Sequence, residues 1–287
     1  MAARFLTPLT FDILWEEQRL GEQPYPLRVP SHGETMDERS LLRQRVGREL
    51  SAQGLKDSYG RLDPALDAAL RMLAVNQLSV DAVHIPDPDT APLAALAATD
   101  GATAVLATQD ADGIWLREIF PDALVSEIVN LLPSSRRGVE RSVTLSLDDA
   151  LRTPPARVKV AATGQAEATA DAEQKGRFGL RKPPRQQERP RRPLSERTAG
   201  NPREDYALLA AQPRLRGGQI AVNARNEAGR KFRSPVLGWF DTVTGRYLSI
   251  TRAGRDGHEW VTLSPADAKT LRTRLADMMS EVSAQAR

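Results

Sequence analysis

The stretch Gly245–Met279, GRYLSITRAGRDGHEWVTLSPADAKTLRTRLADMM, holds the clearest secondary-structure pattern in this sequence of 287 residues. Apolar residues alternate with polar ones over Arg246–Arg252 and again over Glu259–Leu263, which is the period of a strand with one buried face. The glycines of the connection Gly254–Gly257 supply positive φ angles at little cost, as a hairpin turn requires. The pattern predicts two adjacent antiparallel strands.

A helix is predicted directly after the second strand. Ser264 is a suitable N-cap residue, Pro265 fits the first helical position, and Asp267 follows three residues after the cap. The apolar face of this helix carries Leu271, Leu275 and Met278.

Two more strands are predicted upstream, over Gln219–Arg225 and Val236–Phe240, and a short helix precedes them at Glu204–Ala211. The connections contain the glycine and asparagine residues that tight turns favour. Together the four strands predict an antiparallel meander.

A similar order occurs earlier in the chain, with strands predicted at Ser79–Ile85, Thr103–Thr108 and Ile114–Ile119. A helix with Leu124, Ile128 and Leu131 on one face follows Pro121. A shift of 144 residues without gaps superimposes identical residues of the two segments: Gly101 and Gly245, Asp112 and Asp256, Gly113 and Gly257, Pro121 and Pro265, Leu131 and Leu275. We therefore expect an α+β fold with a pseudo-twofold repeat, in which flanking helices pack on a central antiparallel β-sheet.

Helices without a counterpart in the second half precede the first repeat. Thr35 and Glu38 form a capping-box pattern for a helix that ends near Gln53. Asp63 and Pro64 start another helix, and Phe11–Leu20 is also expected to be helical.

The domain organisation follows from one segment of unusual composition. Residues 163–202 are rich in proline, arginine and glutamine and are predicted to form a disordered basic linker. Lys175–Arg203 holds ten Lys or Arg against two Glu, which gives this segment a local charge of +8. The formal net charge of the whole chain is +3, so the residues outside the segment together carry about −5. We expect a single domain over residues 1–287, with an N-terminal half (1–160) and a C-terminal half (203–287).

Several classes of chemistry find no support in the sequence. The absence of cysteine excludes disulfides and thiolate metal sites, and the three histidines share no ligand spacing. No phosphate-binding loop, nucleophile elbow or HExxH is present. We predict no catalytic residues, no metal, no cofactor and no enzyme activity. His32 and His258 are interpreted as loop residues, and the acidic pairs Asp110/Asp112 and Asp148/Asp149 as turn and helix-start residues.

The hydropathy of the sequence indicates whether the chain spans a membrane and in which compartment it lies. No run approaches the roughly 18 consecutive apolar residues of a spanning helix, and the first residues lack an apolar signal core. We expect a cytoplasmic protein without membrane insertion.

Candidate partner-binding residues lie in the connection Pro86–Asp100, PDPDTAPLAALAATD, which joins the first two predicted strands of the repeat. One interpretation is a short covering helix over Pro92–Ala98. The other is a projecting loop that meets another protein through Leu93 and Leu96, beside the acidic Asp87 and Asp89.

Two tryptophans are further candidates. Trp239 and Trp260 sit in apolar strand patterns, where tryptophan is most often part of the core, but either could anchor a partner on a sheet face.

Several motifs, taken in order, resemble the EspG family of proteins associated with ESX (type VII) secretion in actinobacteria. These motifs are LTPLTFDILWE (Leu6–Glu16), PYPL (Pro24–Leu27), SHGET with DER (Ser31–Arg39), LSVDAV (Leu78–Val83), and GRYLSI with EWVTLSPAD (Gly245–Asp267). The resemblance spans both halves and skips the basic linker.

The resemblance implies a pseudo-symmetric fold and a non-enzymatic chaperone. Members of the family bind the tip of the helical PPE partner in PE–PPE heterodimers, keep it soluble and help deliver it for export. The implied partner is a PPE-type protein, as a PE–PPE pair or a PPE-like substrate, and the loop Pro86–Asp100 and the C-terminal part are the implied contact regions. Homodimerisation stays open.

One alternative comes from another class of function. A nucleic-acid-binding or regulatory protein could use Lys175–Arg203, although this segment offers only Phe178 for base stacking, so no nucleic-acid partner is predicted.

Overall fold

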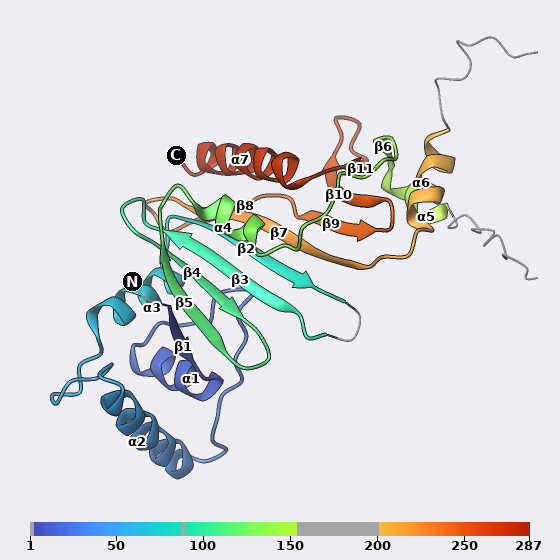
Figure 1. Cartoon of the computed structure of the whole chain (residues 1–287). Helices are drawn as coiled ribbons and strands as arrows, with labels where there is room; N and C mark the ends of the chain where they lie inside the picture. Colours follow the sequence, from blue (N-terminus) through green and yellow to red (C-terminus); the bar gives the residue numbers. More distant parts are fainter. Residues whose placement is uncertain (1–2, 88–89, 154–200) are drawn as a thin grey trace, which may run out of the picture.

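The computed structural model describes residues 3–87, 90–153 and 201–287 (Figure 1). The predicted linker at 163–202 and the basic segment Lys175–Arg203 lie almost entirely outside these residues, so their predicted disorder and role stay predictions.

One antiparallel sheet runs through both halves of the chain. Its strand order is β1-β5-β4-β3-β2-β7-β9-β10-β11-β6, and β8 lies beside β7. The strands are β1 (Arg4–Leu6), β2 (Leu78–Ile85), β3 (Leu93–Thr99), β4 (Ala104–Gln109), β5 (Ile114–Ile119), β6 (Val143–Ser146), β7 (Arg216–Arg225), β8 (Lys231–Arg233), β9 (Leu237–Thr242), β10 (Gly245–Ala253) and β11 (Glu259–Pro265).

The strand order confirms the predicted pseudo-twofold repeat. The two halves meet where β2 pairs with β7, and Asp81 lies opposite Ala221 in this pair. Outward from there, β3, β4 and β5 on one side match β9, β10 and β11 on the other. The sheet is therefore two similar meanders joined at their first strands.

The register corrects the ungapped shift of 144 residues. Thr108 pairs with Trp115 in the first hairpin, and Arg252, 144 residues after Thr108, pairs with Trp260 in the second. The second hairpin is thus longer by one residue. The counterpart of Trp115 is Trp260, and the shared prolines Pro121 and Pro265 do not occupy equivalent positions.

Helices cover parts of both faces of the sheet (Figure 1). Local capping explains where they begin: Thr35 forms the predicted capping box with Glu38, and Asp63 caps the helix that starts at Pro64. The helices are α1 (Pro8–Glu17), α2 (Met36–Ala52), α3 (Pro64–Ala74), α4 (Leu124–Asn130), α5 (Leu147–Arg152), α6 (Pro202–Ala210) and α7 (Ala268–Gln285).

The start of α7 differs from the prediction. Its N-cap is Asp267, whose side chain accepts a hydrogen bond from the backbone N–H of Thr270, and not Ser264. Ser264 and Pro265 still belong to β11 because they pair with Leu248 and Tyr247. Strand pairing therefore delays the helix that the local pattern would start earlier.

The connection predicted at Pro86–Asp100 is the main correction. Residues Leu93–Thr99 are neither the helix nor the projecting loop that we expected, because they form β3 between β2 and β4. Alanine favours helices in isolation, but here the small side chains of Ala95 and Ala97 pack beneath α4. The ladder bonds to two neighbouring strands outweigh a weak local preference.

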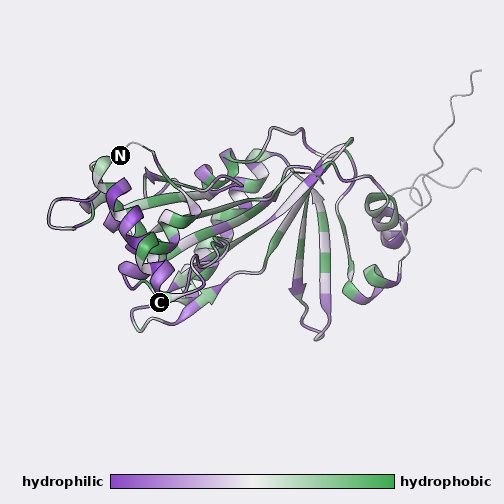
Figure 2. Cartoon of the chain, turned by 90° about the horizontal axis from the view of Figure 1, so that it is seen from below, coloured by the Kyte–Doolittle hydropathy of each residue, from purple (hydrophilic) through white to green (hydrophobic). Residues whose placement is uncertain are grey.

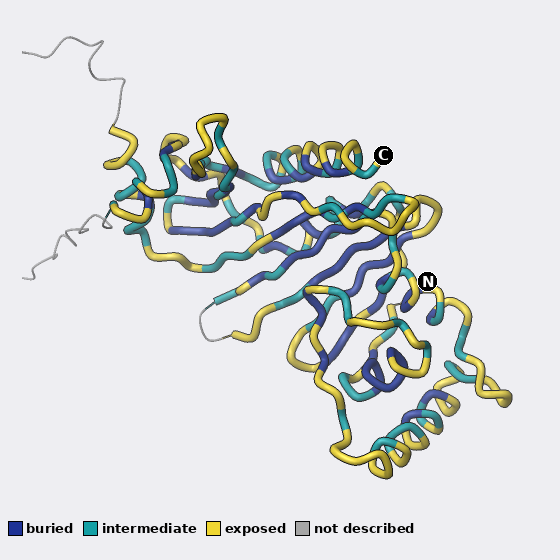
Figure 3. Tube along the Cα trace, turned by 180° about the vertical axis from the view of Figure 1, so that it is seen from behind, coloured by how far each residue is buried: buried dark blue, intermediate teal, exposed yellow. Residues whose placement is uncertain are grey.

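The helices form three cores with the sheet. Helices α4 and α7 pack on one face along β2, β3 and β7, and their shared core contains Ile128 of α4 and Leu271 of α7. On the opposite face, α1, α2 and α3 form a second core over β3, β4 and β5. Helices α5 and α6 build a third, smaller core against β6, β10 and β11. Figure 3 shows the buried residues concentrated along the central strands and the inner side of α7.

Candidate partner-binding surface

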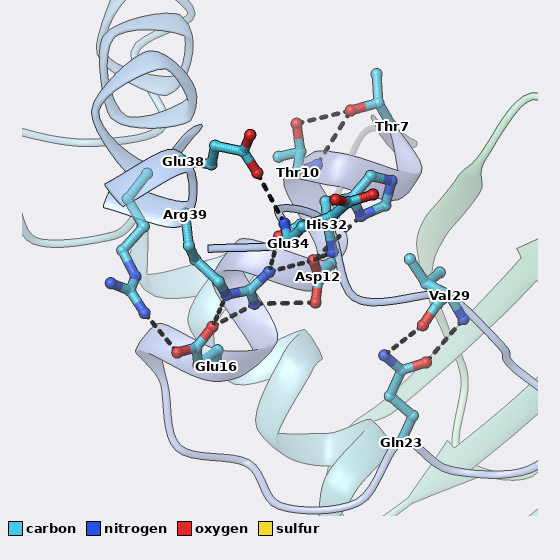
Figure 4. A network of polar contacts seen from close by, with 11 residues as sticks. Thr7, Thr10, Asp12, Glu16, Gln23, Val29, His32, Glu34, Glu38 and Arg39 are labelled. Carbon is cyan, nitrogen blue, oxygen red and sulfur yellow. Dashed lines mark hydrogen bonds and ion pairs between the residues drawn. The ribbon is translucent and has the colours of Figure 1, made fainter. Parts of the chain in front are cut away.

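The motifs that carry the family resemblance meet in a polar network on the N-terminal helices (Figure 4). Arg39 of α2 donates to both carboxylate oxygens of Asp12 in α1, at 2.8 and 3.1 Å, and also binds Glu16. The backbone N–H of His32 donates to Asp12 at 2.8 Å. The network joins α1, α2 and the segment between them.

Asp12 is buried in this network, and its protonation state follows from its partners. Burial raises the pKa of the Asp12 carboxyl, but the hydrogen bonds from Arg39 and His32 outweigh it and hold the pKa below its ordinary value. His32 is thus a loop residue, as predicted, that helps to fix the helical layer. The network has a structural role: it holds α1 and α2 together beside the sheet.

The corresponding face of the C-terminal half carries no described helix over its central strands. Figure 2 shows these strands open between α1–α3 at one end and α5–α6 at the other. The uncovered face, as we call it, presents small or polar side chains that are half-buried or exposed: Gln219 on β7, Gly238 on β9, and Ser249 and Thr251 on β10. Such a floor leaves room for a partner to approach the backbone.

A buried ion pair fixes one end of this half of the sheet. Arg246, 1% exposed, donates to both oxygens of Asp241 at 2.7 and 3.0 Å, and Arg216 adds a bond of 2.7 Å. Burial raises the pKa of Asp241, yet the bonds from Arg246 and Arg216 dominate and lower it below its usual range. The β9–β10 turn is rigidly held as a result.

Trp239 belongs to the core and not to a surface. It is 2% exposed, with His84 stacked at 5.2 Å on its ring and Arg246 4.7 Å from the ring centroid. Of the two interpretations for this residue, the structure selects the core. Leu96 is likewise 2% exposed, in the core beneath the N-terminal helices.

The other predicted contact residues are dispersed. Leu93 is half-buried at the start of β3, and Asp87 accepts a hydrogen bond from Thr90 at 2.5 Å in the β2–β3 hairpin. Asp89 lies outside the described residues. Trp260 is 38% exposed on the β10–β11 hairpin, where its indole N–H donates to Asp256. Leu93 and Asp87 thus lie in one hairpin and Trp260 in another, and all three are at least partly accessible.

An apolar surface that the sequence patterns missed lies at one end of the sheet. Ile85 ends β2, Leu215 precedes β7, and Val243 lies in the β9–β10 turn; these strands are neighbours. The hydroxyl of Thr244 donates to the Gln212 side chain at 2.7 Å, so the C-terminal end of α6, which carries the exposed Leu208, lies near the same turn. We call these four residues, Ile85, Leu208, Leu215 and Val243, the apolar rim; each is at least 45% exposed.

No single motif indicates the rim, because each member is an isolated apolar residue at the end of an element. The only sequence signal is that Leu215 and Val243 fall outside the alternation of the adjacent strands. Strand pairing places Ile85 at the same end of the sheet as Leu215 and Val243, across more than 120 residues of chain.

The remaining acidic residues and helices can be compared with the sequence-based expectations. Within them, no group of three or more His, Asp or Glu side chains is arranged to hold a metal ion. Asp110 and Asp148 lie in a turn and at a helix start, as predicted. Among the described helices, none has the length and apolar character needed to cross a membrane.

Comparisons with known proteins agree with this architecture. The structure is similar to that of the Mycobacterium tuberculosis type VII secretion system chaperone EspG5, solved in complex with a PE25–PPE41 dimer, with a TM-score of 0.62 at 13% identity. The match covers 98% of this chain and 96% of that chain. No curated protein matches in sequence. A sequence model of the EspG family matches residues 7–277, nearly the whole chain. The chain therefore belongs to the EspG family.

Proposed function

We propose that this chain is a type VII (ESX) secretion chaperone that binds the helical tip of a PPE-type protein on its uncovered face and apolar rim. It acts in the cytoplasm by reversible binding, without catalysis, and its partner arrives as a PE–PPE heterodimer or as a PPE-like protein alone. Membership of the EspG family and the likeness to EspG5, which was solved with a PE25–PPE41 dimer, support this proposal.

The observation that carries the proposal is the uncovered sheet face bordered by exposed aliphatic side chains. An apolar helix tip in water favours self-association until its apolar surface is covered. The apolar rim supplies aliphatic contact area, and the small residues Gly238 and Ser249, which pair on the strands behind it, present little side chain to a partner. A helical tip lying between α6 and the β2–β3 hairpin would cover both surfaces.

Complex formation with a natural partner tests the proposal directly. The chain is co-expressed with each PPE-like protein encoded in the same ESX locus, and size-exclusion chromatography with light scattering measures the mass of the eluted species. We expect a stoichiometric complex that keeps the partner soluble. Failure with every folded candidate would overturn the proposed function.

A matched pair of variants then locates the contact. Leu215→Asp places a charge in the apolar rim, whereas Phe120→Asp places one on a 78% exposed residue at the opposite end of the sheet. We expect Leu215→Asp to weaken binding by about tenfold or more, because a carboxylate in an apolar contact is desolvated without a partner. Equal affinities for the two variants would exclude the rim from the interface.

A further inference from the structure

A cleft lies where the uncovered face meets the N-terminal helical layer. Two adjoining cavities share Pro24, Tyr25 and Lys231 in their walls. One of them, about 280 Å³ in volume, extends over the central strands to Asp81 and Arg225. The cleft thus borders the face on which the proposed partner lies.

The lining of this cleft is rich in cations that lack partners. Lys231 and Arg225 have no side-chain hydrogen bond or ion pair within the described part of the chain, and neither does the side chain of Arg28. Glu22 is the one carboxylate of the lining whose side chain likewise makes no hydrogen bond or ion pair within the described residues. We call Arg28, Arg225, Lys231 and Arg233 the basic cleft.

Arg233 makes the cleft rigid as well as basic. Its guanidinium donates to both oxygens of the buried Asp81, at 2.6 and 3.0 Å, and lies 5.5 Å from the ring centroid of Tyr25. Asn223 donates to the same carboxylate at 2.7 Å. Asp81 is therefore fully engaged and does not neutralise Lys231 or Arg225.

The charge of the cleft contrasts with the rest of the folded chain. Outside Lys175–Arg203 the sequence carries about −5, so a group of three unpaired cations is a local excess. Such a group attracts carboxylates and speeds their association, an effect that falls as salt increases.

We infer that the basic cleft binds carboxylate groups of an acidic segment on the protein that docks at the uncovered face. The inference rests on the proposed function, and it specifies the partner: an apolar tip flanked by Asp or Glu on the side that faces α3 and β8. The chain's own basic segment has the wrong sign of charge to occupy the cleft.

Charge reversal in the full-length chain tests the inference. The cleft variant Arg225→Glu/Lys231→Glu is compared with the control variant Lys269→Glu/Arg274→Glu on α7, which changes the net charge equally on the other face. We expect the cleft variant to bind the partner about tenfold more weakly at low salt, mainly through slower association, and the control to change affinity less than about twofold. Glu22→Gln should strengthen binding, because it removes the opposing charge.

A probe that needs no natural partner separates this inference from the proposed function. Fluorescein-labelled octaglutamate is titrated into each protein at low salt, and fluorescence anisotropy gives its Kd, with an eight-nucleotide oligothymidylate as the competing class. The inference predicts weaker octaglutamate binding only for the cleft variant.

The outcomes distinguish failure of the basic-cleft inference from failure of the proposed function. Equal octaglutamate affinities in the cleft and control variants overturn the inference, and so does tighter, cleft-dependent binding of the oligothymidylate. A partner complex that is indifferent to the cleft variant overturns the inference and leaves the proposed function standing. Octaglutamate binding without any partner complex leaves the cleft and removes the proposed function.

Discussion

The two halves of the sheet share a strand order but differ in their covering. The N-terminal half (β2–β5) has helices on both faces. Among the described residues, the C-terminal half (β7 and β9–β11) has α7 on one face, and on the other α5 and α6 pack towards the β6 edge. The helices α1–α3 precede the first repeat, and within the described residues no helical layer of this kind precedes the second. The described helices therefore cover the N-terminal half of this face fully and its C-terminal half only in part.

Equivalent positions show how the sequence has adapted to this difference. Val105 pairs with Ala98 beneath the helices, and at the matching place Ser249 pairs with Gly238 on the uncovered face. Val105 is 3% exposed, while Ser249 is half-buried. A hydroxyl and a glycine tolerate water where a valine and an alanine need a covering helix.

The largest effect is expected from a charge placed at these matched positions. Val105→Asp should lower the free energy of unfolding by about 4 kcal/mol or more, because the carboxylate would be buried without a partner. Ser249→Asp should change it by less than about 0.5 kcal/mol, because water reaches this site. Urea unfolding followed by circular dichroism measures both, and similar losses would show that the two faces are equally covered.

A smaller effect is expected where the C-terminal half has a buried charge. Asp241→Asn leaves Arg246 buried without its carboxylate and should cost about 3 kcal/mol of unfolding free energy. Asp205→Asn on α6 serves as the control, since this residue is only half-buried and near the surface. A loss below about 1 kcal/mol for Asp241→Asn would mean that water reaches the pair.

Acid should lower the stability of both the N-terminal helical layer and the C-terminal half, because each contains a carboxyl group with a lowered pKa. Asp12 and Asp241 have pKa values below the ordinary range, so their ionised forms stabilise the fold above the unfolded-state pKa of about 4. That stability is fully present near pH 6 and is lost as the pH falls through the folded-state pKa values.

Substitution of Asp12 measures how much the helical layer contributes to this acid sensitivity. Urea midpoints measured between about pH 6 and about pH 3 should fall less steeply in Asp12→Asn than in the natural chain, because one of the titrating groups is gone. An unchanged slope would assign the acid sensitivity to other carboxylates.

The smallest effect is expected from deleting residues 154–200. Helices α5 and α6 contact each other directly on either side of this segment, and Arg203 pairs with Asp149 at 2.6 Å. Replacing the segment with a short Gly/Ser linker should change the unfolding free energy by less than about 1 kcal/mol, because loop closure costs vary slowly with length. Partner binding should be retained, and its loss with steep salt dependence would favour the nucleic-acid alternative.

Local rules were enough to predict much of the fold from the sequence. Capping residues such as Thr35 and Asp63, the hairpin glycines and the alternation of β5, β10 and β11 act over a few neighbouring residues, so they could be read directly. The repeat was also visible, because its elements occur twice in the same order.

The features of the fold that depend on pairing between distant residues were decided only by the tertiary structure. The alanine-rich Leu93–Thr99 became a strand because β2 and β4 flank it, and Trp239 became core because His84 and Arg246 enclose it. The apolar rim joins residues that are isolated in sequence. The sequence by itself determined the elements, the repeat and the family resemblance, whereas the uncovered face depends on which helices cover which half, and that is a property of packing over long distances in the chain.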